Sequence, residues 1–348
     1  MKTSDKKSTY VIAEMAWAHD GSLDKALLIL EGAKNANADA ISIHVTDLND
    51  YMVPKYGSGE GRVSAGKESE AIFNYLNKIN LSQEDWIVFS KKAIELEIDL
   101  CVMPNDSSSL EFCEDSLILE SYVLSAAAFS EVDFVRAVAA KQKRTFLRIG
   151  GASLAEIEDV ISIFADQGND QIVLLYGHQN YPTKVEDTQF NKLNMYKSLF
   201  GYPVGMADHL DGDSFEALAL PTMAIALGAD YIEKHITYDR SEKGEDFEAA
   251  LGPDSFKTFV GLIRSAEQAM GSSIWSPMSS SEKKYREASR KKAVAKRNIE
   301  AGEKMTRDLV TFKRSDSGLP PGDIDLIIGR VANKPLSEND GLSTEHFI

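Results

Sequence analysis

The residues of this sequence that are best suited to chemistry are histidines and carboxylates that follow short β-rich runs. Five of the six histidines stand at or just past the end of such a run: His19, His44, His178, His209 and His235. Neutral imidazole beside a carboxylate such as Glu14 suits a divalent ion of the Mn²⁺, Fe²⁺ or Zn²⁺ class, and imidazole also moves protons. One histidine alone is more often a core or surface residue. Five together predict a metal or acid–base site.

The runs that must position these residues alternate with helical patterns. Eight β-rich runs are predicted near Tyr10–Glu14, Ala40–Val45, Asp99–Met103, Tyr122–Leu124, Thr145–Ile149, Ile172–Tyr176, Val204–Ala207 and Tyr231–His235. Amphipathic helices are predicted between them, among others at Leu23–Asn35, Gln83–Leu96, Leu154–Ala165 and Phe215–Leu227. Eight such units in about 240 residues predict an α/β fold, a closed (β/α)8 TIM barrel with its catalytic groups at the C-terminal strand ends. A doubly wound open sheet is the weaker alternative.

The composition of the chain changes after the last predicted barrel helix, Pro253–Met270. We expect a barrel over residues 1–271, a linker over 272–290 and a small β-rich domain over 291–348. Twelve of the 38 Lys and Arg residues fall between Lys283 and Arg314, with four acidic residues in the same stretch. We interpret this basic stretch as a solvated face of the linker, in preference to a nucleic-acid or membrane patch.

Composition also excludes several classes of protein. The 348 residues carry a formal net charge of −16, which repels a nucleic-acid backbone but allows a small anion in a local pocket. Cys101 and Cys113 are too few for a disulfide framework or a zinc cluster. No apolar run approaches the ~20 residues of a membrane span, and the first residues do not resemble a signal peptide. We expect a cytoplasmic protein without nucleic-acid or membrane partners.

Several segments, in order along the chain, resemble the sialic acid (N-acetylneuraminate) synthase family. They are VIAEMAWAHDGSLDKALLILEGAKNANADAI near the N-terminus, NYPTKVED (180–187), PVGMADH (203–209), ALGADYIEKHIT (226–237) and KGEDFEAALGPDSF (243–256). The segment KRNIEAGEKMTRDLVTFKR is similar to the C-terminal SAF (antifreeze-like) domain of that family. The resemblance implies a (β/α)8 barrel followed by an SAF domain. It also implies a homodimer in which the SAF domain of one subunit covers the barrel of the other.

The resemblance implies roles for particular residues. The family joins phosphoenolpyruvate (PEP) to an amino-sugar aldehyde. His209 and His235 would hold a divalent metal, Mn²⁺ in the first place and Fe, Zn or Mg as alternatives, which polarises the aldehyde. Glu14 would manage protons at the new bond. The substrate contacts that the resemblance implies are Tyr181, Asp246 and Arg314.

The PEP half of the site departs from the family pattern. The changed segments are Ser42–Ile43–His44 for Lys-Phe-Gln, Met103–Pro104–Asn105 for Thr-Pro-Phe and Val123–Leu124–Ser125–Ala126 for Lys-Ile-x-Ser, with Ala128, Gln179 and Ala207 also changed. The loss of two lysines alone removes roughly 3–6 kcal/mol of binding, or about 10²–10⁴ in affinity. Arg148 stands where the family has a small hydroxyl residue. It is either a replacement cation in the site or an outward, solvated arginine.

Three functions follow from this pattern. We favour a metal-dependent enzyme of carbohydrate biosynthesis that makes or breaks a C–C bond of a sugar or hydroxy-carbonyl substrate by aldol-type chemistry, without using PEP in the usual way. In it, Glu14, His44 or His178 would move the proton, and Gln179 and Arg148 would contact the substrate. The second function is ordinary PEP-dependent nonulosonate synthesis, with the phosphate held by Arg148 and backbone groups. The third is a non-catalytic, sugar-binding homologue.

Overall fold

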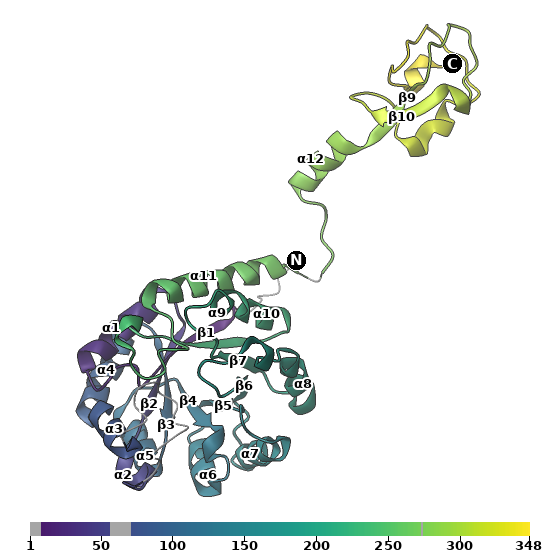
Figure 1. The fold of residues 1–348 in the computed structure, drawn as a ribbon. Helices are drawn as coiled ribbons and strands as arrows, with labels where there is room; N and C mark the ends of the chain where they lie inside the picture. The colour runs from purple at the N-terminus through teal and green to yellow at the C-terminus, as the bar shows by residue number, and fades with distance from the viewer. Residues whose placement is uncertain (1–7, 56–70, 273) are drawn as a thin grey trace. The chain divides into compact units, whose positions relative to one another are not determined.

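The computed structural model describes residues 8–55, 71–272 and 274–348. The chain divides into two compact units, Met1–Gly271 and Ser272–Ile348, and each is described by itself. The first unit is a closed barrel of parallel strands in the order β1 to β8 (Figure 1). This confirms the predicted TIM barrel and excludes the open sheet. The strands are β1 Tyr10–Ala16, β2 Ala40–Val45, β3 Asp99–Pro104, β4 Ser121–Ser125, β5 Arg144–Arg148, β6 Ile172–Tyr176, β7 Val204–Asp208 and β8 Tyr231–His235.

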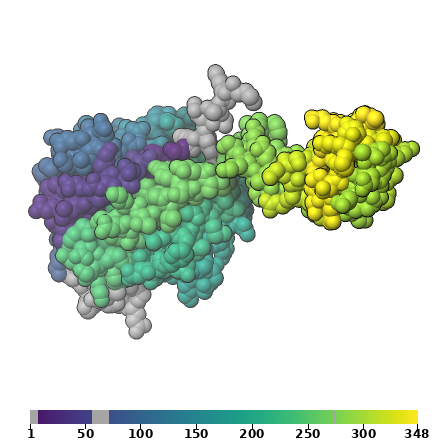
Figure 2. Space-filling view, turned by 90° about the horizontal axis from the view of Figure 1, so that it is seen from above, coloured from purple at the N-terminus to yellow at the C-terminus, as the bar shows by residue number. Residues whose placement is uncertain are grey.

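Helices surround the barrel (Figure 1). They are α1 Leu23–Asn35, α2 Leu48–Tyr51, α3 Ile72–Ile79, α4 Gln83–Glu95, α5 Ser107–Ser116, α6 Val132–Ala140, α7 Leu154–Asp166, α8 Asn191–Phe200, α9 Glu216–Ala219, α10 Pro221–Ala226 and α11 Pro253–Met270, with short 3-10 turns η1 Ala126–Ala128, η2 Val185–Asp187 and η3 Arg240–Glu242. Figure 2 shows the surface of the first unit, on which α11 lies along α1. Gly32 of α1 closely approaches Pro253 of α11. The prediction of a single helix over Phe215–Leu227 is wrong, because the structure has two short helices there, α9 and α10. Pro221 begins a second helix there, because proline lacks the N–H that a continuous helix needs.

The two-residue period of the strands decides which side chains enter the barrel. Ile12 of β1 and Tyr231 of β8 belong to the apolar cluster that fills the interior, whereas the neighbouring Val11 and Ile232 pack against the helices. Residues two positions further along therefore also point inward, and these include the carboxylates of β1 and β8. Lys234 faces the opposite way. Its Nζ lies 2.7 Å from the buried Asp208 carboxylate and donates to the Leu210 carbonyl at 2.8 Å.

The second unit contains one helix, α12 Ser280–Ser289, and an antiparallel pair, β9 Lys291–Ala295 and β10 Val310–Arg314. Short 3-10 turns η4 Arg307–Leu309, η5 Pro321–Leu326 and η6 Thr344–His346 complete it. This confirms the predicted small β-rich domain. Its own apolar core is formed by Ala293, Ala295, Ile299, Met305, Leu309, Ile324, Ile327, Ala332, Leu336, Leu342 and Phe347. Among the described residues, no helix has the length and apolar character needed to cross a membrane.

Candidate functional site

A buried cluster of charged side chains lies inside the barrel near the C-terminal ends of its strands. Arg148 of β5 forms an ion pair with Glu14 of β1, and its Nη2 lies 2.9 Å from Oε1 of Glu233 on β8. His44 of β2 places its Nε2 3.2 Å from Oε1 of Glu14 and 3.5 Å from Nη1 of Arg148. The same Glu14 oxygen accepts the backbone N–H of Ala16 at 2.9 Å. Four strands thus bring two carboxylates, a guanidinium and an imidazole together.

Burial and charge set the protonation of this cluster. Burial by itself would raise the pKa of Glu14, but Arg148 and His44 outweigh it and hold the pKa well below its usual range. Burial raises the pKa of Glu233 to about 7, although Arg148 opposes this. Arg148 is thus one cation between two fully buried carboxylates. Of the two placements left open by the sequence, the structure shows the inward one.

His209 and His235 lie side by side, with ring centroids 5.3 Å apart. His209 directly follows β7, and His235 ends β8. His209 Nδ1 lies 2.8 Å from the carbonyl oxygen of His178, so Nδ1 carries the proton and Nε2 keeps its lone pair. Burial lowers the pKa of His209 to about 3, and burial followed by the nearby His209 lowers that of His235. Both imidazoles are therefore neutral near pH 7.

These two histidines fit a divalent metal. Both Nε2 atoms are buried and have no hydrogen-bond partner among the described residues. The hydrogen bond from His209 Nδ1 to the His178 carbonyl fixes the orientation of the ring. Metal-binding histidines are commonly oriented by a hydrogen bond of this kind from their second ring nitrogen. No group of three or more His, Cys, Asp or Glu side chains in the described part of the chain is arranged to hold an ion. A metal held here would have these two nitrogens as its protein ligands and would keep positions open for oxygen ligands.

The residues expected to contact substrate fall into two groups. The Tyr181 ring lies 4.5 Å from the His209 ring and 5.5 Å from the His235 ring, and its hydroxyl donates to Oε1 of the exposed Gln179 at 2.9 Å. Asp246 is half-buried, and burial, followed by the charges of Glu245 and Glu14, raises its pKa to about 8. These side chains belong to the mouth of the barrel.

Other expected residues lie elsewhere. The side chain of His178 is exposed, and its contact with His209 is made by its backbone carbonyl. His19 is fully buried, with Nδ1 accepting the Gly21 N–H at 3.1 Å and its ring edge-on to Trp86. Arg314 belongs to the second unit, where its guanidinium donates to the Ala288 carbonyl at 2.8 and 3.0 Å.

Glu233 is the site residue that sequence reasoning did not select. It was visible as the residue two positions before His235 on the same predicted strand, and a two-residue period places both on the inner face. Its pairing with Arg148 could not be read from either strand alone.

Comparisons with known proteins agree with this architecture. The NeuB family matches residues 29–275, and the SAF domain matches residues 290–348. A pseudaminic acid synthase of Campylobacter jejuni is 30% identical over 348 residues, which is 99% of this chain and 98% of that protein. An N,N'-diacetyllegionaminic acid synthase of Legionella pneumophila is 28% identical and covers 97% of this chain and 94% of that protein.

Solved structures show the same fold. A sialic acid synthetase from Leptospira borgpetersenii, in complex with citrate, superposes with a TM-score of 0.69 at 23% identity, over 83% of this chain and 96% of that one. A putative spore coat polysaccharide biosynthesis protein E from Chromobacterium violaceum gives a TM-score of 0.72 at 18% identity, over 98% of this chain and 100% of that one.

Proposed function

The chain belongs to the NeuB family, and from that premise we propose that it is a metal-dependent synthase or aldolase-like enzyme of carbohydrate biosynthesis. Its substrate is a sugar or another hydroxy-carbonyl compound, and it makes or breaks a C–C bond next to the carbonyl. The observation that carries the proposal is the pair of neutral, buried imidazoles of His209 and His235, whose Nε2 atoms have no protein partner among the described residues.

A divalent ion bound there, Mn²⁺ in the first place, would polarise the substrate carbonyl as a Lewis acid. The protein supplies the rest. In the synthetic direction, the first carbonyl compound loses a proton from the carbon next to its carbonyl group. That carbon forms a bond to the carbonyl carbon of the second compound, and the carbonyl oxygen of the second compound takes up a proton. Glu14 and His44 are 3.2 Å apart and would carry the proton. Tyr181, over both histidine rings, would hold the sugar chain in place.

The charge balance of the cluster supports a reaction that does not use PEP in the usual way. PEP carries a phosphate and a carboxylate, and both need cations. Arg148 is already paired with Glu14 and Glu233, so a bound phosphate would have to compete with two buried carboxylates. Ser42 and Ser125 occupy inward positions of β2 and β4 and offer hydroxyls, which bind phosphate more weakly than ammonium groups do.

Ordinary PEP-dependent nonulosonate synthesis is the second candidate. It is favoured by the near-complete coverage of relatives named pseudaminic and N,N'-diacetyllegionaminic acid synthases. Phosphate release from PEP with a panel of N-acetylated hexosamines separates the two candidates. Metal-dependent release at ordinary enzyme rates would contradict our reading of the PEP half.

The metal is tested by titrating Mn²⁺ into the wild-type protein and into His209→Ala, with His346→Ala as the matched control in the other unit. We expect binding to wild type and to the control, and loss of binding in His209→Ala. Glu14→Gln should still bind Mn²⁺. Its rate of hydrogen–deuterium exchange at the carbon next to a substrate carbonyl should be about 10²–10⁴-fold lower than that of the wild type. Equal rates in wild type and Glu14→Gln would favour the non-catalytic homologue.

A further inference from the structure

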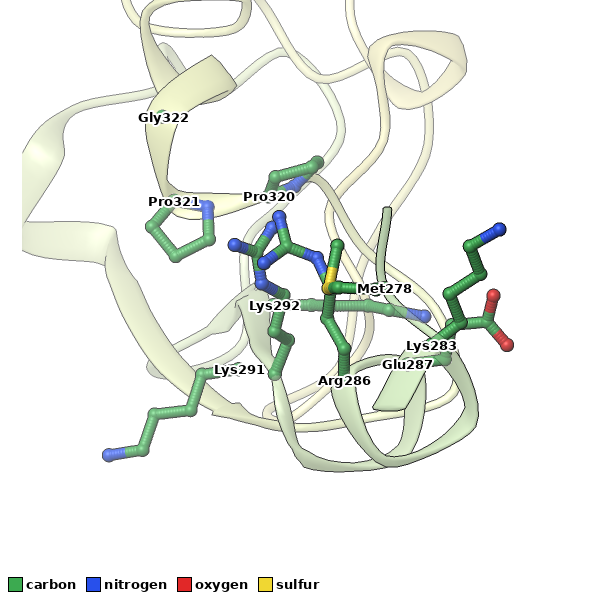
Figure 3. A pocket seen from close by; sticks show the side chains of 10 residues that line it. Met278, Lys283, Arg286, Glu287, Lys291, Lys292, Pro320, Pro321 and Gly322 are labelled. Atoms are coloured by element: carbon green, nitrogen blue, oxygen red, sulfur yellow. The ribbon is translucent and has the colours of Figure 1, made fainter. Parts of the chain in front are cut away.

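The second unit contains a basic pocket that none of the functions above uses. It is a hollow of about 830 Å³ between α12 and the body of the SAF domain (Figure 3). We call it the α12 pocket, and it is lined by Met278, Lys283, Arg286, Glu287, Arg290, Lys291, Lys292, Pro320, Pro321 and Gly322.

Helical spacing gathers the cations on one face of α12. Lys283, Arg286 and Arg290 are separated by three and four residues, so they share a face of the helix and its C-terminal cap. Lys291 and Lys292 follow at the start of β9, where successive side chains alternate, and Figure 3 shows these two extending in different directions. Five of the twelve cations of the basic stretch therefore line one hollow.

These cations lack neutralising partners. Glu287 is the one carboxylate among the lining residues, and none of the five cations lies within ion-pair distance of a carboxylate in the described part of the chain. Lys292 donates to the backbone carbonyl of Asp316 at 2.6 Å, which leaves its charge uncompensated. Like charges three and four residues apart destabilise a helix. An anion in the pocket would remove this repulsion.

The remaining lining is apolar. Pro320 and Pro321 lie across the pocket from the Arg286 side chain, and Met278 lies beside that arginine (Figure 3). The side chains of Lys283 and Lys291 extend outward from this centre. Arginine forks bind phosphate oxygens in pairs, while proline and methionine side chains pack against a flat or apolar group. We propose that the α12 pocket binds a small molecule with two or more phosphate groups on a ring-containing body, the class to which nucleoside diphosphates belong.

The test is calorimetric titration of the full chain with ADP, and with adenosine and inorganic pyrophosphate as partial ligands. We expect ADP to bind, adenosine not to bind, pyrophosphate to bind more weakly than ADP, and the ADP affinity to fall as salt rises. Arg286→Gln and Arg290→Gln should each weaken ADP binding about tenfold or more. Lys304→Gln is the matched control, because Lys304 is an exposed cation of the same unit outside the pocket, and it should leave the affinity within about twofold.

Three outcomes would overturn the proposal. One is the absence of ADP binding, and another is equal affinity in wild type and in the Arg286→Gln, Arg290→Gln double variant. The third is that the double variant separates a dimer into monomers while ADP has no effect, which would make the pocket a contact between copies. Both arginines are exposed, so the variants should fold, and thermal melting of the second unit checks this. Because the pocket lies wholly in that unit, its failure leaves the proposed barrel chemistry untouched.

Discussion

At the scale of single residues, Arg148 has the largest consequence. Its guanidinium contacts both Glu14 and Glu233, and all three side chains are buried. A buried ion pair gains little over an apolar substitute, but removal of one partner leaves an unpaired charge in the interior. The stability of the site therefore depends on Arg148.

Arg148→Met should lower the free energy of unfolding by about 3–5 kcal/mol. The physical reason is that both carboxylates lose their counter-charge, and the measurement is urea denaturation at pH 7. Arg136→Met is the control, because Arg136 forms an exposed pair with Asp133 on α6 and its loss should cost at most about 1 kcal/mol. Equal losses in the two variants would contradict the buried pairing.

The raised pKa of Asp246 makes stability depend on pH. With a pKa of about 8 in the folded protein and near 3.8 in the unfolded chain, the folded state keeps a proton that the unfolded state releases. The contribution of Asp246 to the free energy of unfolding should therefore be greatest below pH 4 and fall as pH rises to 8. Asp246→Asn should make the profile flatter in this window. Asn also tolerates the positive φ of 58° at this position.

Denaturant titrations at several pH values between 4 and 8 measure this effect. Asp133→Asn, which changes an exposed carboxylate, should keep the slope of the wild type. If Asp246→Asn had the same slope as wild type, Asp246 would be ionised throughout the range.

The positions of the candidate residues at the C-terminal ends of the predicted strands showed which side chains could meet. Side chains alternate along each strand, and the strands are parallel, so both facts together determine which residues face the barrel interior. Glu14, His44, His209 and His235 were found in this way. The direction of His178 was not predictable, since it lies in a loop where no period applies and its carbonyl rather than its ring meets His209. The direction of Arg148 was left open as well, because the partners that bury it lie on strands β1 and β8.

At the scale of elements, the barrel was predictable and one helix was not. The eight strands begin and end within two residues of the predicted bounds, because short apolar runs between helices admit few other structures. The break between α9 and α10 was signalled by Pro221 in the sequence, but amphipathic spacing across it predicted one helix. The pairing of β8 with β1 joins residues more than 200 positions apart, and no local pattern shows it.

The loop after β6, whose His178 carbonyl orients His209, is packed closely against the backbone of β7. A Cβ at Gly177 would lie 2.2 Å from the Ala207 carbonyl oxygen, a clash that requires β6 or β7 to shift. Gly177→Ala should therefore weaken Mn²⁺ binding by about tenfold or more, although Gly177 is not a ligand, because it displaces the His178 carbonyl. Calorimetric titration of the metal measures this.

Gly261→Ala is the control for that prediction. Gly261 lies on the exposed side of α11, and a Cβ there meets open space. The substitution should raise the free energy of unfolding by roughly 0.5–1 kcal/mol and leave metal affinity unchanged. Unchanged metal affinity in Gly177→Ala as well would show that the loop adapts without moving His209.

At the scale of the whole molecule, the two units differ in charge and in core. The first has 24 Lys and Arg against 43 Asp and Glu, a formal net charge of −19, and the second has 14 against 11, or +3. Each has its own cluster of buried apolar residues. The overall net charge of −16 is thus the sum of a negative first unit and a positive second unit. The expectation that the protein has no nucleic-acid partner therefore applies more strongly to the barrel than to the second unit.

Separate cores predict separate unfolding. Calorimetry of the full chain should show two transitions with enthalpies roughly in proportion to the lengths of the units, since unfolding enthalpy scales at about 0.7 kcal/mol per residue. Limited proteolysis in the exposed stretch 274–279 should release both units intact. One cooperative transition that disappears after cleavage would instead mean that the units stabilise each other.

The closure of the barrel also has a consequence for biosynthesis. β1 pairs with β8, and roughly 220 residues separate them, so the open edge of β1 waits for its partner until the eighth strand has left the ribosome. At about 5–20 residues per second this takes roughly 10–45 seconds. An unpaired edge is a template for association with other chains. We therefore expect nascent chains that stop before residue 231 to be held by chaperones, and chains that extend past α11 to be released.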